Sequence, residues 1–295
     1  MGKEKTIWYH IVAIVVVLIW GCTFVNSKVL LQQGLAPHEI FSLRFLFAYL
    51  CIWTISPRKL WSDSWKDEIL MILLGITGGS LYFVTENLAV KLDYVNNVSF
   101  IVCTAPLLTT ILALLFLKSV KANRYLILGS IVATLGVALV VFNGQFILQL
   151  NPLGDALALS AALCWAFYSI LMKFVADRYS AVFVTRKVFI YGLITVLPIY
   201  LIEPWNFPLE GFLKPAVWGN LLFLGFIASF ACFVLWSWVI KKIGALPVSN
   251  YVYLNPVSTV VFSALVLDEP MTWLAWMGAA AILLGVYLSN KKELN

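Results

Sequence analysis

Long apolar stretches alternate with short polar connections along the whole chain. Most stretches hold roughly 20 residues, the length at which an α-helix crosses a hydrocarbon core about 30 Å thick. Residues 11–19 and similar runs are continuously apolar, whereas strands of a membrane barrel would alternate apolar and polar positions. The pattern therefore predicts an all-α polytopic membrane protein with ten transmembrane helices. The expected spans are residues 8–31, 40–55, 69–90, 95–117, 125–142, 153–176, 182–202, 217–240, 247–267 and 273–289.

Composition and charge agree with this pattern. Of the 295 residues, 62% are hydrophobic and 12% are charged, against roughly 25% charged residues in soluble domains. The net charge of +6 does not indicate a nucleic-acid partner, because the basic residues gather in short loops. With the N-terminus in the cytoplasm, fourteen Lys and Arg residues lie in cytoplasmic segments and only Lys91 and Lys214 lie on the opposite side. The positive-inside rule then predicts that both termini are cytoplasmic. The surrounding partner of the apolar spans is expected to be a lipid bilayer.

The second half of the sequence repeats features of the first. The predicted repeats are residues 1–146 and 147–295, and each contains five spans. Because five is an odd number, the second repeat enters the membrane upside down. Inverted repeats are a feature of transporters whose binding site lies near the midplane, between the repeats. The matching positions are residues 20–28 with 165–173, Arg44 with Arg186, and Pro106 with Pro256, at offsets of 145, 142 and 150 residues.

The same positions carry a resemblance to a known family. The segments that begin at Trp20 and Trp165, the proline-centred fourth helices and the turn Leu267-Asp268-Glu269-Pro270 resemble the drug/metabolite transporter superfamily, in particular its EamA-type exporters. The first repeat departs from the acidic turn, since it reads Leu117-Lys118-Ser119-Val120. The resemblance covers nearly the whole chain. It implies two five-helix repeats, export of amino acids, other metabolites or drugs, and a bacterial inner membrane.

Ionisable residues inside spans are the first candidates for a substrate site, because charge is costly in a bilayer. Lys28, Arg44 and Glu86 lie at similar depth in the outer third of the predicted bundle. We expect Glu86 to pair with one of the two cations and to line a central cavity. The alternative is that Lys28 and Arg44 extend to the lipid headgroups. Arg186 and Lys187 lie near the cytoplasmic surface and are expected to be ordinary positive-inside residues.

Aromatic and amide side chains inside spans extend this set. They either pack against neighbouring helices or form the wall of a cavity. Tyr82 lies one helical turn before Glu86, and Trp236 occupies the position of Glu86 in the second repeat, at an offset of 150 residues. Pro106 and Pro256 interrupt corresponding helices and are predicted hinges. The predicted cavity lies between the first, third and fourth helices of each repeat, and its further candidate residues are Trp165, Tyr168 and Asn255.

These features favour a secondary transporter that exports small metabolites by alternating access. The alternatives are a channel-like facilitator and a polytopic membrane enzyme. The only two histidines, His10 and His38, lie near opposite faces of the membrane, and the sequence has no metal-ligand or phosphate-binding motif. We therefore expect no enzyme activity, no cofactor and a small-molecule substrate. Protons are a candidate coupling ion, and a monomer or a weak homo-oligomer is expected.

Overall fold

The computed structural model describes residues 3–56, 59–117, 124–142, 151–267 and 272–289. Within these ranges the chain forms helices and connecting turns, without a strand, and the helices build the ten predicted spans. Six spans have at least 20 residues and are apolar enough to cross a membrane. The spans are α1 (Lys3–Gln32), α2 (Pro37–Trp53), α3–η1–α4 (Trp65–Gly75, Ile76–Ser80, Leu81–Leu92), α5–α6 (Val95–Val102, Ala105–Phe116), α7 (Arg124–Phe142), α8 (Pro152–Val175), α9–η2 (Ala181–Val196, Leu197–Leu201), α10–η4–α11 (Pro215–Leu222, Phe223–Ala231, Cys232–Ile243), α12–η5–α13 (Ala245–Ser249, Asn250–Leu254, Asn255–Leu267) and α14 (Trp273–Ser289), with η3 (Leu209–Leu213) in the connection between α9–η2 and α10.

Polar side chains start several spans at the places where the apolar pattern begins. Ser64 accepts a hydrogen bond from the backbone N–H of Asp67 and caps α3, and Ser180 caps α9 in the same way. Asn151 caps α8 by accepting from Gly154 N, and its Nδ2 donates to Leu92 O at 2.9 Å. These caps satisfy backbone donors that have no partner inside their own helix. The last contact also holds the start of α8 against the end of α4.

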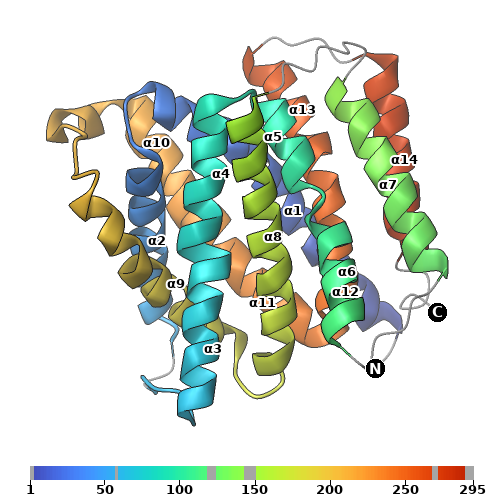
Figure 1. Ribbon diagram of the computed structural model, residues 1–295, viewed down its shortest axis with the longest axis horizontal. Coiled ribbons are helices and arrows are strands. Elements are labelled where there is room, and N and C mark those ends of the chain that lie inside the picture. The colour runs from blue at the N-terminus through green and yellow to red at the C-terminus, as the bar shows by residue number, and fades with distance from the viewer. Residues whose placement is uncertain (1–2, 57–58, 118–123, 143–150, 268–271, 290–295) are drawn as a thin grey trace.

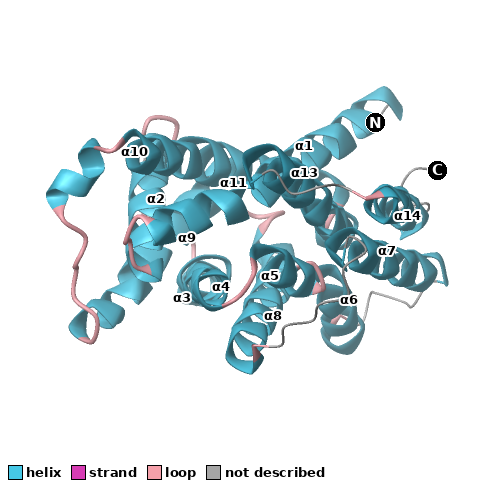
Figure 2. Ribbon diagram, turned by 90° about the horizontal axis from the view of Figure 1, so that it is seen from above, coloured by secondary structure: helices cyan, strands magenta, loops and turns pink. Residues whose placement is uncertain are grey.

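The helices form one bundle in which segments of the two repeats interleave (Figures 1 and 2). α8 packs along α4, α1 packs along α13, and α2 packs along η4. α1 and α8 run in opposite directions through the bundle (Figure 1). The end of the bundle at which α1 begins and α8 ends carries Lys59, Arg178 and Lys241, and we call it the basic end.

The fifth helices of the two repeats, α7 and α14, lie side by side at one edge of the bundle in both views (Figures 1 and 2). Glycines allow their backbones to approach. A Cβ atom on Gly129 would lie 2.4 Å from Ser289 N, and one on Gly285 would lie 2.4 Å from Ala133 N. Small residues at such crossings are typical of packed membrane helices.

A π-helical segment interrupts the third span of each repeat. η1 covers Ile76–Ser80 and contains the non-helical residue Gly79, with φ −129° and ψ −105°. η4 covers Phe223–Ala231 and lies at an offset of about 150 residues from η1. A π turn carries one extra residue, so it shifts the hydrogen-bond register and turns the following residues to another face. These two segments were not expected from the apolar pattern, and they occupy corresponding places in the two repeats.

Candidate functional site

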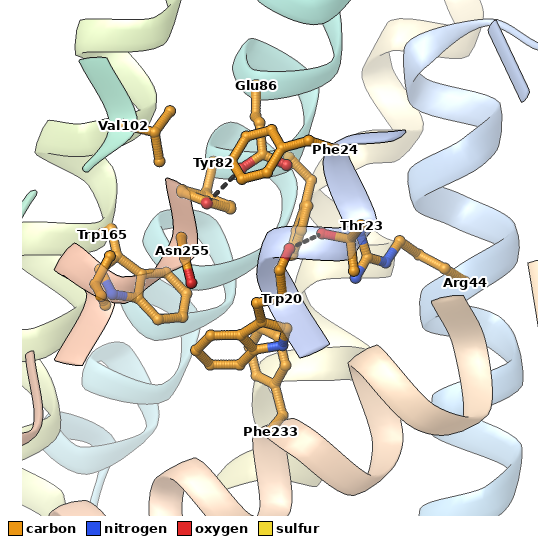
Figure 3. A pocket seen from close by; sticks show the side chains of 12 residues that line it. Trp20, Thr23, Phe24, Arg44, Tyr82, Glu86, Val102, Trp165, Phe233 and Asn255 are labelled. Carbon is orange, nitrogen blue, oxygen red and sulfur yellow. Dashed lines mark hydrogen bonds between the residues drawn. The ribbon is translucent and has the colours of Figure 1, made fainter. Parts of the chain in front are cut away.

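A cavity lies between the two repeats, at the level of the helix breaks (Figure 3). Seven spans contribute to its wall: the first, third and fourth helices of each repeat, and α2. Its empty volume is about 420 Å³, but the lining side chains leave little room for even a water-sized molecule. The cavity is therefore narrow, and a metabolite needs side-chain or helix movement to enter. The lining residues are Trp20, Thr23, Phe24, Arg44, Tyr82, Phe83, Glu86, Val102, Trp165, Phe233, Val252 and Asn255.

Arg44 supplies a cation to this cavity from the middle of α2. Its side chain is only 1% exposed. Nε donates to Ser229 Oγ at 2.9 Å, and Cζ lies 4.2 Å from the centre of the Phe83 ring. Nη1 is buried and has no hydrogen-bond partner among the residues that the structure describes. A buried charged donor without a partner is costly, so Arg44 holds a donor that a bound ligand can satisfy.

Glu86 supplies a carboxyl group to the cavity wall from α4. Tyr82, one helical turn earlier, donates its hydroxyl to Glu86 Oε2 (Figure 3). Among the described residues that line the cavity, Glu86 is the only carboxylate. No ion pair within 4.0 Å joins it to Arg44 in the described part of the chain. The expected pairing of Glu86 with a cation is therefore not a direct contact here, and the cavity wall carries a guanidinium and a carboxyl group that lie apart.

The second repeat contributes polar atoms without charge. Asn255 begins α13, directly after the 3₁₀ segment η5 and before Pro256. Its Oδ1 is buried and has no hydrogen-bond partner within the described part of the chain. The indole N–H of Trp165, on α8, is buried and likewise has no partner in the described ranges. Together with Arg44, these atoms give the cavity wall two unsatisfied donors and one unsatisfied acceptor.

Aromatic rings close the cavity toward the basic end. Trp20 and Trp165 meet edge to face, with ring centres 5.2 Å apart. Trp236 lies 4.9 Å from Trp20 and 6.2 Å from Trp165, and Phe233 contacts both tryptophans. Tyr168 stacks beside Trp165 at 5.0 Å. Since Trp236 and Tyr168 are fully buried, this cluster separates the cavity from the basic end.

The structure thus brings five of the predicted site residues to the cavity wall: Arg44, Tyr82, Glu86, Trp165 and Asn255. Tyr168 and Trp236 lie in the aromatic cluster behind the wall. Lys28 lies elsewhere, because its ammonium donates to Val90 O at 2.7 Å and to Asp93 O at 3.2 Å. These carbonyls end α4, where the helix dipole favours a cation, and the expected pairing of Lys28 with Glu86 does not form.

The predicted hinge prolines lie at the helix breaks. Pro106 is in the first turn of α6, after the break that follows α5, and Pro256 is in the first turn of α13. Proline fits the first turn of a helix because no backbone donor is needed there. Both breaks are next to cavity residues, Val102 in the first repeat and Asn255 in the second. We propose that both prolines act as hinges.

Sequence reasoning missed several lining residues, all without charge. Phe83 and Phe233 occupy equivalent positions in the two third helices, at an offset of 150 residues, and the repeat comparison could have found them. Thr23 lies one turn after Trp20 and donates to Trp20 O at 2.7 Å. Val102 and Val252 carry no signal that separates them from ordinary core residues.

Buried ion pairs tie the two repeats together at the basic end. Lys187 of α9 pairs with Glu68 of α3, and both side chains are at most 5% exposed. Tyr191 also donates to Glu68. The expectation that Lys187 is an ordinary positive-inside residue is therefore wrong. The same holds for Arg186, which is buried and donates to Ser56 Oγ and Lys59 O.

A second contact at this end involves the turn between α8 and α9. Arg178 pairs with Asp67 at 2.6 Å. Tyr179 donates its hydroxyl to Asp67 Oδ2 at 2.8 Å and accepts a hydrogen bond from Asp63 N at 2.9 Å. Burial raises the pKa of Tyr179, so its hydroxyl stays a donor at neutral pH. These contacts connect α3 of the first repeat to the second repeat.

The described residues show no metal-binding cluster. No group of three or more His, Cys, Asp or Glu side chains lies close enough to hold an ion within the described ranges. His10 Nδ1 lies 2.5 Å from Tyr251 OH, and His38 Nδ1 lies 3.6 Å from Glu203 Oε2. Each histidine thus has a structural partner in the second repeat.

Inverted repeats with a binding cavity between them are the architecture of many membrane transporters. The chain belongs to the EamA-like transporter family, whose model matches residues 7–142 and again residues 152–291. It is 31% identical to the uncharacterized transporter YyaM of Bacillus subtilis, over 92% of this chain and 89% of that protein. It is 27% identical to an uncharacterized transporter of Archaeoglobus fulgidus, over 96% and 98% of the two chains.

Two further comparisons concern function and fold. A protein of Escherichia coli named a probable amino-acid metabolite efflux pump is 25% identical over 95% of this chain and 93% of its own length. A solved crystal structure superimposes with a TM-score of 0.73, at 16% identity, and covers 99% of this chain and 98% of that one. The last comparison supports the fold alone.

Proposed function

We propose that this transporter exports amino acids and similar small zwitterionic metabolites across the cell (inner) membrane by alternating access. The observation that carries this proposal is the separation of a guanidinium and a carboxyl group on the cavity wall. Arg44 presents an unsatisfied donor, and Glu86 presents a carboxylate. A zwitterion carries the complementary groups on one small molecule.

Each group of such a substrate has a partner. The substrate carboxylate binds Arg44 Nη1, because charge-assisted hydrogen bonds to a carboxylate are among the strongest in proteins. The ammonium binds Glu86 and Asn255 Oδ1. The apolar part lies against Trp20, and further lining rings are Phe24 and Phe233. The name of the Escherichia coli relative supports the same substrate class and the direction.

Alternating access is supported by the symmetric scaffold and by the closure of one end. The aromatic cluster and the Lys187–Glu68 pair close the path to the basic end in this conformation. The inverted repeats supply an opposite conformation in which the other path closes. We propose that the basic end faces the cytoplasm, on the charge count, so both termini are cytoplasmic. The cavity lies within one chain, which is consistent with a functional monomer.

Protons are the proposed coupling ion. Glu86 is the carboxylate on the cavity wall, and Tyr82 holds one of its oxygens. A proton and a substrate ammonium would compete for this carboxylate, which couples entry of one to release of the other. Replacement of Glu86 by glutamine removes this competition while it retains the side-chain shape.

Counterflow in proteoliposomes tests the proposed function. Vesicles that contain the purified chain and a high internal concentration of unlabelled neutral amino acid should accumulate the same radiolabelled amino acid transiently and saturably. The amide of that amino acid, which lacks the carboxylate, and the deaminated acid, which lacks the ammonium, should compete poorly. Lys91→Gln, an exposed cation remote from the cavity, is the matched control and should behave as the parent.

Two results would contradict the proposal. Uptake that rises linearly with concentration and needs no internal substrate would indicate a channel. Absence of counterflow across a full panel of amino acids, with the protein correctly folded, would exclude this substrate class.

A further inference from the structure

The two tryptophans at the centre of the bundle have different hydrogen-bond states. Trp20 Nε1 donates to Ala228 O at 2.8 Å, across 208 residues of sequence. Trp165, its counterpart in the second repeat, is 4% exposed, and its Nε1 has no hydrogen-bond partner among the described residues. Because a buried donor is normally satisfied, this difference between equivalent residues needs an explanation.

The acceptor of Trp20 lies in a special part of the backbone. Ala228 belongs to the π-helical segment η4, and a π turn changes which carbonyls are used inside the helix. The position equivalent to Ala228, at an offset of 150 residues, is Gly78 in the π-helical segment η1. Repeat symmetry therefore assigns the carbonyl of Gly78 as the acceptor for Trp165.

In the present conformation, the Tyr168 ring covers Gly78, whose carbonyl is the acceptor assigned to Trp165. Its ring packs so closely on Gly78 that a Cβ atom there would lie 2.3 Å from Tyr168 Cδ2. Its side chain is fully buried. The counterpart of Tyr168 in the first repeat is Thr23, since each lies three residues after its tryptophan. The residue at this position is therefore a large ring only in the second repeat, where it packs on η1 of the first repeat.

We infer that Trp20 and Trp165 are alternate latches of the two transport conformations. The bond from Trp20 to Ala228 holds the conformation seen here, which is closed at the basic end. A bond from Trp165 to the carbonyl of Gly78 holds the opposite conformation, after Tyr168 has moved off Gly78. One indole N–H is unsatisfied in each conformation, so the cost of a buried donor without a partner is the same in both and the two states stay close in free energy.

This inference rests on the proposed alternating access, and it gives Trp20 and Trp165 opposite effects on the balance between states. Phenylalanine keeps a ring at each position and removes the N–H. Trp20→Phe should favour the conformation that is open at the basic end, and Trp165→Phe should favour the closed one. Two equivalent core tryptophans with a merely structural role would instead shift the balance in the same direction or leave it unchanged.

The test uses a cysteine reporter at the basic end. Ser237 is 1% exposed, lies on α11 one turn beyond Phe233, and contacts Thr185 Oγ1 at 3.0 Å. In the purified full chain, with the five native cysteines replaced, Ser237→Cys should react slowly with a maleimide. Addition of Trp20→Phe should raise the rate about fivefold, the effect of one net hydrogen bond. Trp165→Phe should lower it by a similar factor, and the double variant should return to the parent rate.

A second variant keeps the test independent of any damage at the tryptophans. Tyr168→Leu removes the ring that packs on Gly78 and should raise the labelling rate, as Trp20→Phe does. Shifts of the two tryptophan variants in the same direction, or rates unchanged in both, would overturn the inference. Labelling is measured without substrate, so this result is distinct from a failure of counterflow, which would count against the proposed function.

Discussion

The third spans of the two repeats share a backbone and differ in chemistry. Both contain a π-helical segment, and both carry a phenylalanine at the same place on the cavity wall, Phe83 and Phe233. The first repeat then places Tyr82 and Glu86 at the centre, whereas the second places Cys232 and Trp236 at the equivalent positions. Glu86, which accepts a hydrogen bond from Tyr82 in the first repeat, is thus matched by the indole ring of Trp236 in the second.

The second helices differ in the same way. Arg44 is directed to the cavity and binds Ser229. Its counterpart Arg186 is directed to the basic end, where it binds Ser56 and Lys59 O. The inverted orientation explains this difference, because equivalent positions lie at opposite depths in the membrane. The comparison teaches that the symmetric backbone provides two related conformations, while the asymmetric side chains provide one set of charges for the substrate.

The largest expected effect is at Arg44. Arg44→Gln removes the cation that binds the substrate carboxylate. We therefore predict that counterflow falls by roughly 100-fold or more, the range for removing one partner of a buried charge pair, here the pair of Arg44 with the bound substrate. Initial rates in proteoliposomes measure this change. The matched variant in the second repeat, Arg186→Gln, should reduce transport less at equal amounts of folded protein. Equal losses in the two variants would contradict the assignment of recognition to the first repeat.

The next effect is at Glu86. Glu86→Gln keeps the shape and the hydrogen bond from Tyr82, and it removes the charge that binds an ammonium or a proton. We predict a loss of roughly tenfold in counterflow together with a flat dependence on pH. Counterflow rates measured from about pH 5 to about pH 8 test both the fall in rate and the flat dependence on pH. A variant with normal rates at every pH would show that Glu86 has only a structural role.

A third prediction concerns stability at the basic end. Glu68→Gln and Lys187→Met each leave one buried partner of an ion pair uncompensated, which costs about 3–5 kcal/mol. Each single variant should therefore lower the thermal unfolding temperature of the purified protein clearly. The double variant should lose much less than the two single losses together, since contacting residues are not additive. Additive losses would show that the pair contributes no coupling between the repeats.

The smallest effect is expected at Lys28. Its ammonium binds the carbonyls that end α4 and does not reach the cavity. Lys28→Met should therefore change the substrate concentration at half-maximal counterflow by less than about twofold and lower stability by about 1 kcal/mol. Substrate titration of counterflow measures the first quantity. A large change in apparent affinity would place Lys28 in the substrate path.

The sequence predicted the ten spans and the inverted repeats because hydrophobic length and repeated residues are local signals. It also found Arg44 and Glu86, since charge inside a span stands out in a sequence. It could not find that Lys28 reaches backbone carbonyls, because the distance from Lys28 to the end of α4 depends on packing between spans. The π-helical segments were not predicted for a related reason: the sequences of η1 and η4 contain glycine and other small residues, as those of many membrane helices do.

The central claim is that Arg44 recognises the carboxylate of a zwitterionic substrate. The most direct measurement compares, in the parent and in Arg44→Gln, the competition of an amino acid and of its amide in the same counterflow or binding assay. The parent should prefer the amino acid over the amide by roughly tenfold or more, and Arg44→Gln should bind the two compounds almost equally and weakly. An Arg44→Gln protein that keeps the full preference for the free carboxylate would contradict this account.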